Sequence, residues 1–194
     1  LLEDYLSIMS SADNYQVFSD VEHVLKKPGM YVGSNQIISE EMYVMKDDKI
    51  VKKNIEYIPA LQRIYEEIIL NAFDQTVREG TGCTEIHVSI EPDTNTISVY
   101  NNGEGIPIVL KEELGCYVPE MIFGMLRSSS NYKDETRITG GTNGLGSKLT
   151  NIFSKVFTLE TVDSTRKKLY VQEWSNNMEI KTEPEITSIG RKKP

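Results

Sequence analysis

Residues 61–78 read LQRIYEEIILNAFDQTVR, and we expect this stretch to decide the fold. An α-helix has about 3.6 residues per turn, so Glu67, Asn71 and Asp74 leave one face of this helix. A carboxylate followed one turn later by an amide oxygen can deprotonate a water molecule and hold a hard cation. The alternative is a surface helix whose Glu and Asn side chains are solvated.

The rest of the same helix is largely apolar. Its apolar residues are Leu61, Ile64, Tyr65, Ile68, Ile69, Ala72 and Phe73. An apolar surface this wide is expected to lie in a core, where it would hold the polar stripe rigidly. We therefore expect the other elements to pack around this helix.

The composition is that of an ordinary globular domain. The chain has 194 residues, of which 39% are hydrophobic and 26% charged, enough for one domain with a substantial core. Its 21 basic and 29 acidic residues give a net charge of −8, which argues against nucleic-acid binding over the general surface. Cys83 and Cys116 lie far apart and there are two histidines, so no zinc-site spacing exists. No apolar run approaches the roughly 18 residues of a membrane span, so we expect a soluble intracellular protein without membrane contact.

Local patterns predict the elements around the central helix. Residues 1–19 read as an arm, and Asp20 caps a short helix that Pro28 ends. Alternating residues over 42–54, with Asp47 and Asp48 as the turn, predict a hairpin. The further expected elements are hairpins over residues 84–100 and 156–174, helices from Val118 and Leu149, and an edge strand over residues 179–186.

A second motif, NNGEGIP at residues 101–107, follows the end of a predicted strand. Gly103 and Gly105 permit positive φ and let a flat ligand come close to the backbone. The side-chain oxygen of Asn101 can accept a hydrogen bond from the amine of a purine. An ordinary Asn-Gly turn explains this motif equally well when it is considered alone.

A third motif, GGTNGLGSK at residues 140–148, is followed at once by a helix. Backbone N–H groups at glycines and at a helix start bind anions, and Lys148 adds a positive charge. Gly141 and Gly146 have the spacing of a P-loop, but Ser-Lys replaces Lys-Ser/Thr and no apolar strand precedes them, which disfavours a P-loop. The whole polar stretch 127–148 is longer than a passive connection and is typical of a lid.

Taken together in this order, the three motifs resemble the Bergerat-type (GHKL) ATPases, which include gyrase, the Hsp90 chaperone, histidine kinases and MutL. Within that group the chain most resembles the ATPase domain of type IIA DNA topoisomerases of the eukaryotic or viral branch. The resemblance runs from about Tyr15 to Glu183. The strings that narrow it are VEHVLKKPGMYVGS, YIPALQRIYEEIILNAFD, ISVYNNGEGIPI, YVPEMIFGMLRSSSNY and ITGGTNGLGSKLTNIFS.

The resemblance implies a fold and a domain organisation. The fold is α+β, a two-layer α/β sandwich in which helices cover one face of a mixed, mostly antiparallel sheet, with a long glycine-rich ATP lid. Residues 1–19 would form an N-terminal arm, or strap. Residues 20–194 would form the ATPase domain, truncated before the transducer domain that follows in the family.

The resemblance also assigns roles to matching residues, with ATP and Mg²⁺ as cofactors. Glu67 would be the general base, Asn71 would coordinate Mg²⁺ and Asn101 would contact the adenine. Tyr15 would belong to the arm, which crosses to the other protomer when ATP dimerises the domain. The further residues implied at the nucleotide are Gly105, Ser129, Ser130, Asn131, Gly141, Thr142, Asn143, Gly144, Leu145, Gly146, Ser147 and Lys148.

One residue departs from the family pattern. Glu104 stands where relatives commonly have Arg or Lys, so an ion pair with Asp74 cannot be carried over, because two acids repel each other. Arg78, one turn beyond Asp74, is the substitute partner that we consider.

The implied function is an ATP-hydrolysing gate that forms a homodimer on ATP binding and drives DNA strand passage, with DNA engaged through the full-length protein. It would act in the nucleus, the cytoplasm or a viral replication site. One alternative is a nucleotide-binding module with little turnover, because the transducer lysine that reaches the γ-phosphate is absent before Pro194. A chaperone or mismatch-repair ATPase on the same fold is the other alternative.

Overall fold

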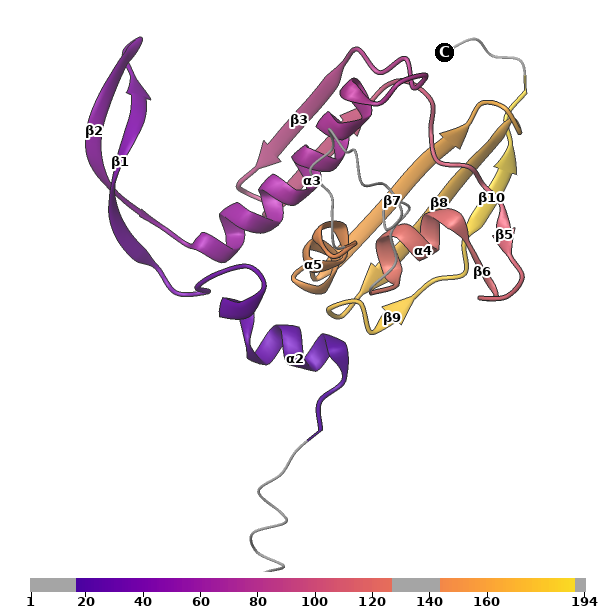
Figure 1. The fold of residues 1–194 in the computed structure, drawn as a ribbon, viewed down its shortest axis with the longest axis horizontal. Helices are drawn as coiled ribbons and strands as arrows, with labels where there is room; N and C mark the ends of the chain where they lie inside the picture. The colour runs from indigo at the N-terminus through magenta and orange to yellow at the C-terminus, as the bar shows by residue number, and fades with distance from the viewer. Residues whose placement is uncertain (1–16, 127–143, 191–194) are drawn as a thin grey trace, which may run out of the picture.

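The computed structural model describes residues 17–126 and 144–190 as an α+β fold, which confirms the expected fold class (Figure 1). The elements are α2 (Asp20–Lys26), the 3₁₀ helix η1 (Pro28–Met30), β1 (Ile38–Lys46), β2 (Lys49–Tyr57), α3 (Pro59–Val77), β3 (Ile86–Glu91), β4 (Thr96–Asn101), β5 (Leu110–Lys111), β6 (Cys116–Tyr117), α4 (Val118–Gly124), α5 (Gly146–Ile152), β7 (Val156–Asp163), β8 (Lys168–Ser175), β9 (Ile180–Lys181) and β10 (Glu185–Ser188).

The strands form several antiparallel ladders. Hairpins β1–β2 and β3–β4 and the short pair β5–β6 are separate, whereas β10, β8 and β7 form a larger sheet, in which β9 also pairs with β8. Every strand pair within the described ranges is antiparallel, so the parallel component of the expected mixed sheet is not found there. In Figure 1, α4 and α5 lie over one face of the larger sheet, and β1–β2 stands away from the body.

The first helix is capped one residue earlier than expected. Ser19, not Asp20, is the N-cap: its hydroxyl accepts from the N–H of Glu22 at 3.2 Å. The Glu22 carboxylate accepts in return from the N–H of Ser19 at 2.8 Å, which completes a capping box. The hydrogen bond from Ser19 is the main reason that the pKa of Glu22 is lowered.

The hairpins follow the turn chemistry of the sequence. Asp47 and Asp48 have φ of 50° and 56°, the two positive values of a two-residue type I′ turn between β1 and β2. The predicted hairpins β3–β4 and β7–β8 are also confirmed. In place of the one predicted edge strand, two short strands, β9 and β10, lie on either side of Pro184 and both pair with β8.

Helix α3 begins with Pro59 in its first turn, where the missing N–H costs nothing. Its apolar surface is only partly buried. Ala72 is buried, but Leu61 is 53% exposed and Phe73 is 51% exposed, so their expected place in a core is wrong for this structure. No helix of the described ranges is long and apolar enough to span a membrane.

Two core clusters hold the elements together. The first core cluster joins α2, α3 and α5, and its buried members are Val24, Val32, Ala60, Leu149 and Ile152. The second core cluster lies at the β7–β8 strands, and its buried members are Ile108, Leu159, Tyr170 and Trp174. Trp174 is 1% exposed and lies opposite Phe157 in the β7–β8 hairpin.

Helix α4 is fixed to the sheet by close contacts. A Cβ on Gly124 would lie 2.7 Å from Nε1 of Trp174, so glycine is required where the helix meets the indole. Buried Glu120 accepts a hydrogen bond from Nε2 of Gln172 at 3.2 Å and forms an ion pair with Lys181. These contacts fix the helix that precedes Ser129, Ser130 and Asn131 in the sequence, for which the family resemblance implies nucleotide contacts.

Candidate functional site

The polar stripe of α3 faces the interior of the molecule. The Glu67 side chain is 18% exposed, and Asp74 is 9% exposed. Nδ2 of Asn71 is buried and has no hydrogen-bond partner within residues 17–126 and 144–190. A buried amide without a partner is costly, which is typical of a group kept for a ligand. The solvated surface helix, which the sequence left open, is therefore ruled out for this face.

Helix α5 covers this stripe at Glu67. A Cβ on Gly146 would lie 1.9 Å from Oε2 and 2.9 Å from Cδ of Glu67, so any side chain there would collide with the carboxylate. The hydroxyl of Thr150 donates to the carbonyl of Ile64 at 2.8 Å, which ties α5 to α3 one turn away. The first motif and the last glycine of the third motif are thus in direct contact.

The end of the third motif is helical and buried. The sequence predicts a helix from Leu149, but α5 begins at Gly146, after Gly144 with a positive φ of 60°. Ser147 donates its hydroxyl proton to the carbonyl of Ile122 at 3.1 Å, and the side chain of Leu145 packs against the first core cluster.

Lys148 also points into the molecule. It is 2% exposed, and this burial lowers its pKa to about 8. The structure therefore places the predicted phosphate-binding lysine within the helix that packs on α3.

In the second motif the two asparagines have different surroundings. The side chain of Asn102 is engaged by the loop before β3: its Oδ1 accepts from the N–H groups of Thr84 and Glu85 at 2.8 and 2.9 Å. Asn101, at the end of β4, donates from Nδ2 to the carbonyl of Asn102 at 3.0 Å. Its Oδ1 has no partner among the described residues, which leaves an acceptor of the kind that a purine amine requires.

The two glycines of this motif are needed for different reasons. Gly103 has a φ of +99°, as expected. Gly105 has no positive φ, and a Cβ there would lie 2.0 Å from the carbonyl oxygen of Val162. Its lack of a side chain therefore permits close packing on β7.

Two residues of β7 that sequence reasoning missed hold this turn. The hydroxyl of Thr161 accepts from the N–H of Ile106 at 3.1 Å, and Oδ2 of Asp163 accepts from the N–H of Ile108 at 2.8 Å. Burial opposes ionisation of Asp163, but hydrogen bonds from the N–H groups of Arg166 and Ile108 outweigh it and lower its pKa. No local signal identifies these contacts, because their partners are distant in the sequence.

Glu104 and Arg78 both have backbone hydrogen bonds near the end of α3. Glu104 is exposed, and its N–H donates to the carbonyl of Thr81 at 2.6 Å. The recorded contact of Arg78 with Asp74 is a backbone hydrogen bond of 3.2 Å from N–H to carbonyl.

The residues fit a magnesium ion that is bound mainly by phosphates. Within the described ranges, no group of three or more His, Cys, Asp or Glu side chains could hold a metal by itself. Mg²⁺ commonly takes only one or two protein ligands together with substrate phosphates. The unpaired Nδ2 of Asn71 is a donor and does not bind a metal, but the same amide carries an oxygen of the kind that Mg²⁺ takes.

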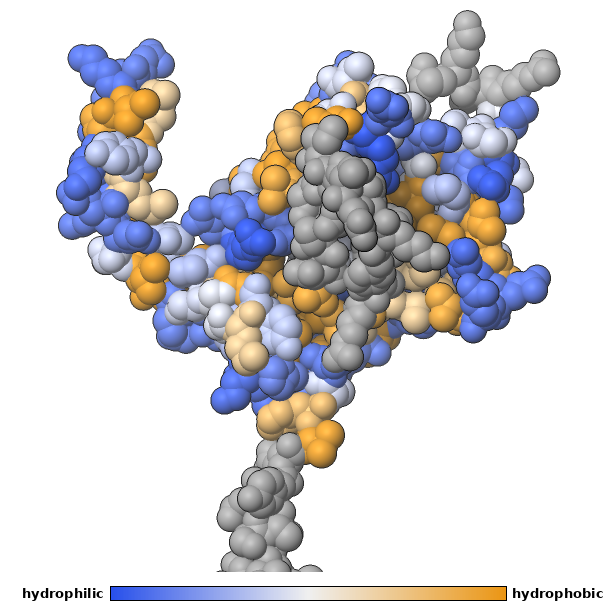
Figure 2. Space-filling model, viewed as in Figure 1, coloured by the Kyte–Doolittle hydropathy of each residue, from blue (hydrophilic) through white to orange (hydrophobic). Residues whose placement is uncertain are grey.

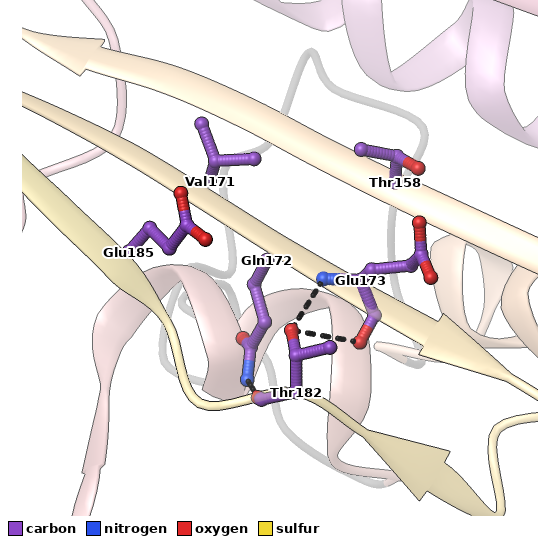
Figure 3. Close-up of a pocket in the computed structure, with 6 residues that line it drawn as sticks. All are labelled: Thr158, Val171, Gln172, Glu173, Thr182 and Glu185. Atoms are coloured by element: carbon purple, nitrogen blue, oxygen red, sulfur yellow. Dashed lines mark hydrogen bonds between the residues drawn. The ribbon is translucent and has the colours of Figure 1, made fainter.

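Two hollows lie elsewhere on the molecule. One, of about 220 Å³, lies over β8, where Thr182 accepts from the N–H of Glu173 at 3.1 Å (Figure 3). The other is an apolar groove of about 700 Å³, and it is lined by Ile37, Met42, Ile55, Glu56, Tyr57, Ile58, Leu61, Gln62, Tyr65, Ile90 and Ile97. No predicted site residue lines either hollow.

Several predicted site residues lie outside the described residues. They are Tyr15, Ser129, Ser130, Asn131, Gly141, Thr142 and Asn143. Their roles stay predictions.

Comparisons with known proteins agree with this geometry. The sequence profile of a family described as histidine kinase-, DNA gyrase B-, and HSP90-like ATPase matches residues 57–185. The DNA topoisomerase 2 of Pisum sativum is 46% identical over 174 residues, which make up 89% of this chain and 12% of the relative. The chain thus spans about an eighth of the length of such curated relatives.

Solved structures show the same fold. The ATPase region of Saccharomyces cerevisiae topoisomerase II matches with a TM-score of 0.89 and 44% identity, over 94% of this chain and 49% of that one. The 43K ATPase domain of Thermus thermophilus gyrase B matches with a TM-score of 0.60 and 23% identity, over 88% of this chain and 35% of that one, which is a likeness of fold.

Proposed function

The chain belongs to the histidine kinase-, DNA gyrase B- and HSP90-like ATPases, and we propose that it binds and hydrolyses ATP as the N-terminal gate of a type II DNA topoisomerase. It is homologous to the N-terminal ATPase region of eukaryotic type II topoisomerases, so the resemblance stated from the sequence is confirmed. The observation that best supports the proposal is the contact between Gly146 of the glycine motif and the carboxylate of Glu67.

The chemistry that we propose is divided among three side chains. Glu67 accepts a proton from the attacking water, because its carboxylate is partly enclosed and fixed beside Gly146. Asn71 would hold Mg²⁺, which would neutralise charge on the phosphates. Asn101 accepts a hydrogen bond from the adenine amine through Oδ1. Most of the barrier reduction in such a reaction comes from positioning and charge neutralisation, so the fixed geometry of these groups is the main contribution of the chain.

We further propose that ATP joins two copies of the chain, with the arm that contains Tyr15 crossing to the partner. DNA would be bound by the full-length protein, as the name of the longer relatives, DNA topoisomerase 2, suggests for them. The ATP cycle would time the passage of one duplex through another. The protein would act wherever that DNA lies, in the nucleus or the cytoplasm, including a viral replication site.

The test separates binding from hydrolysis. Calorimetry gives the affinity for ATP with and without Mg²⁺, and a single-turnover assay with the chain in excess gives the rate of hydrolysis. Glu67→Gln should lower the rate by about 10²- to 10⁴-fold, the usual contribution of a general base, and leave the affinity nearly unchanged. Asn71→Ala should weaken the affinity only when Mg²⁺ is present.

Glu66→Gln is the matched control, since it removes the neighbouring carboxylate, which is 42% exposed. It should leave both quantities unchanged. Equal loss of affinity and rate in Glu67→Gln would mean that Glu67 is structural, and the proposed role would then be wrong.

A second candidate is a module that binds nucleotide with little turnover. If calorimetry shows that the chain binds ATP but the single-turnover assay detects no hydrolysis, this second candidate is the correct one.

A further inference from the structure

Arg63 contacts the carboxylate of Glu67, although it belongs to none of the three motifs. Its Nη2 lies 2.5 Å from Oε1 of Glu67, one turn further along α3, and its Nη1 lies 3.8 Å from Oε2 of Glu66. The Arg63 side chain is 48% exposed, against 18% for Glu67. The guanidinium therefore reaches the carboxylate from the more exposed side of the helix.

The two oxygens of Glu67 consequently have different surroundings. Oε1 is beside the guanidinium of Arg63, and Oε2 lies against the backbone of Gly146. These two contacts restrict rotation about the terminal bonds of the Glu67 side chain. A general base needs such a fixed orientation, because proton transfer requires a defined distance to the water.

Helix stability is a weak reason for this ion pair. Partly exposed pairs one turn apart contribute little, and a cation placed before the acid is the less favourable order in a helix. Glu66 has another partner, since Nε2 of Gln62 donates to its Oε1 at 2.8 Å. The main effect of Arg63 is therefore expected in the reaction and not in folding.

We propose that Arg63 is a positioning residue that holds Glu67 by Oε1, so that Oε2 is the oxygen that accepts the proton of the attacking water. The proposal rests on the proposed function, in which Glu67 is the general base. The water oxygen forms a bond to the γ-phosphorus as its proton passes to Oε2. The bond from that phosphorus to the β–γ bridging oxygen breaks, and ADP leaves with the electron pair.

The test is Arg63→Met, which keeps the length of the side chain but removes its charge and donors. In single-turnover assays the rate constant should fall by about 10- to 100-fold, as expected for a misplaced catalytic group. The dissociation constant for ATP should change by less than about threefold, because Arg63 holds the base and not the nucleotide. The Tm should change by less than about 2 °C, because the ion pair is partly exposed.

Two further variants separate positioning from a general loss of charge. Arg63→Lys keeps the charge with a single point donor in place of the planar fork, so part of the rate should return. Lys52→Met is the matched control, because it breaks the exposed ion pair with Glu41 on the β1–β2 hairpin. This control should leave the rate and the affinity unchanged.

Crystal structures of the wild type and Arg63→Met give a readout that does not need activity. The Glu67 carboxylate should keep one position beside Gly146 in the wild type and leave it in the variant. An unchanged hydrolysis rate in Arg63→Met would overturn the proposal. Should the wild type neither bind nor hydrolyse ATP, the proposed function fails, and an unmoved Glu67 in the variant would then overturn the role of Arg63 separately.

Discussion

The two sides of α3 show an inverted pattern of burial. On the side that meets α5, the polar residues Glu67 and Asp74 are largely buried. On another side, the apolar residues Leu70, Phe73 and Val77 are 45%, 51% and 40% exposed, at the spacing of one helix stripe. Apolar surface is also exposed on the β1–β2 hairpin (Figure 2). A helix selected only for stability would bury the apolar stripe and expose the polar one. The inversion indicates that the polar side is kept for function.

The largest effect is expected where α5 touches the polar side. Gly146→Ala places a Cβ within 1.9 Å of Oε2 of Glu67, so either the carboxylate or α5 must move. We expect the single-turnover rate to fall by about 100-fold, and overpacking to cost about 1–3 kcal/mol of unfolding free energy. Gly29→Ala is the control, since a Cβ there meets nothing within 4 Å. A single-turnover rate in Gly146→Ala equal to that of the wild type would contradict the proposal that the contact with Gly146 positions Glu67 for catalysis.

The next effect is a pH dependence on the polar side. Burial lowers the pKa of Lys148 to about 8, so between about pH 8 and 10.5 the unfolded chain binds more protons than the folded chain. Stability from this group should therefore rise with pH across that window. The unfolding free energy of the wild type relative to Lys148→Met should increase by about 2–3 kcal/mol from pH 8 to 10.5.

Chemical denaturation at several pH values measures this difference. Lys155→Met, at an exposed lysine, is the matched control for the loss of a lysine side chain. A constant difference between the wild type and Lys148→Met would mean that the lysine is not desolvated in solution.

Two threonines allow the sides of α3 to be compared directly. Thr150 donates to the carbonyl of Ile64 across the contact between α5 and α3, and Thr76 donates to the carbonyl of Phe73 on exposed α3, both at 2.8 Å. Thr150→Val should cost about 1 kcal/mol of unfolding free energy, the usual value for one hydrogen bond. Thr76→Val should stay within about 0.5 kcal/mol, because water replaces the bond. Equal costs would contradict the different burial of the two sides.

The smallest effect is expected on the exposed apolar stripe. Leu70→Gln should change the unfolding free energy by less than about 0.5 kcal/mol, because the side chain loses little burial. Ile152→Ala, at a residue with no exposure in the first core cluster, should cost about 2–5 kcal/mol. Thermal unfolding of both variants makes this comparison. A cost above about 2 kcal/mol for Leu70→Gln would show that the stripe is covered in solution.

Elements with local signals were predicted well from the sequence. Helix α3 and the β1–β2 hairpin depend on periodicity and on turn residues such as Asp47, which neighbouring positions reveal. The start of α5 at Gly146 was missed, since glycines predict a loop and only the contacts with α3 extend the helix back to them. The ties from Thr161 and Asp163 were missed because their partners lie far away in the chain.

Exposure could be predicted only in part from the pattern on α3, where Ala72 is buried as expected. Apolar periodicity shows which residues can be buried, but not which elements cover them, so Phe73 was wrongly expected in a core. For the candidate site, the residues of the first and third motifs were identified before the structure, and their direct contact is what the structure adds.

A crystal structure of the chain with a non-hydrolysable ATP analogue and Mg²⁺ tests the central claim most directly. The account predicts that the γ-phosphate lies beside Glu67 and Gly146, that the side-chain oxygen of Asn71 binds Mg²⁺, and that the adenine amine donates to Asn101. A nucleotide bound in the apolar groove beside Leu61, or a Glu67 carboxylate turned away from the triphosphate, would contradict it.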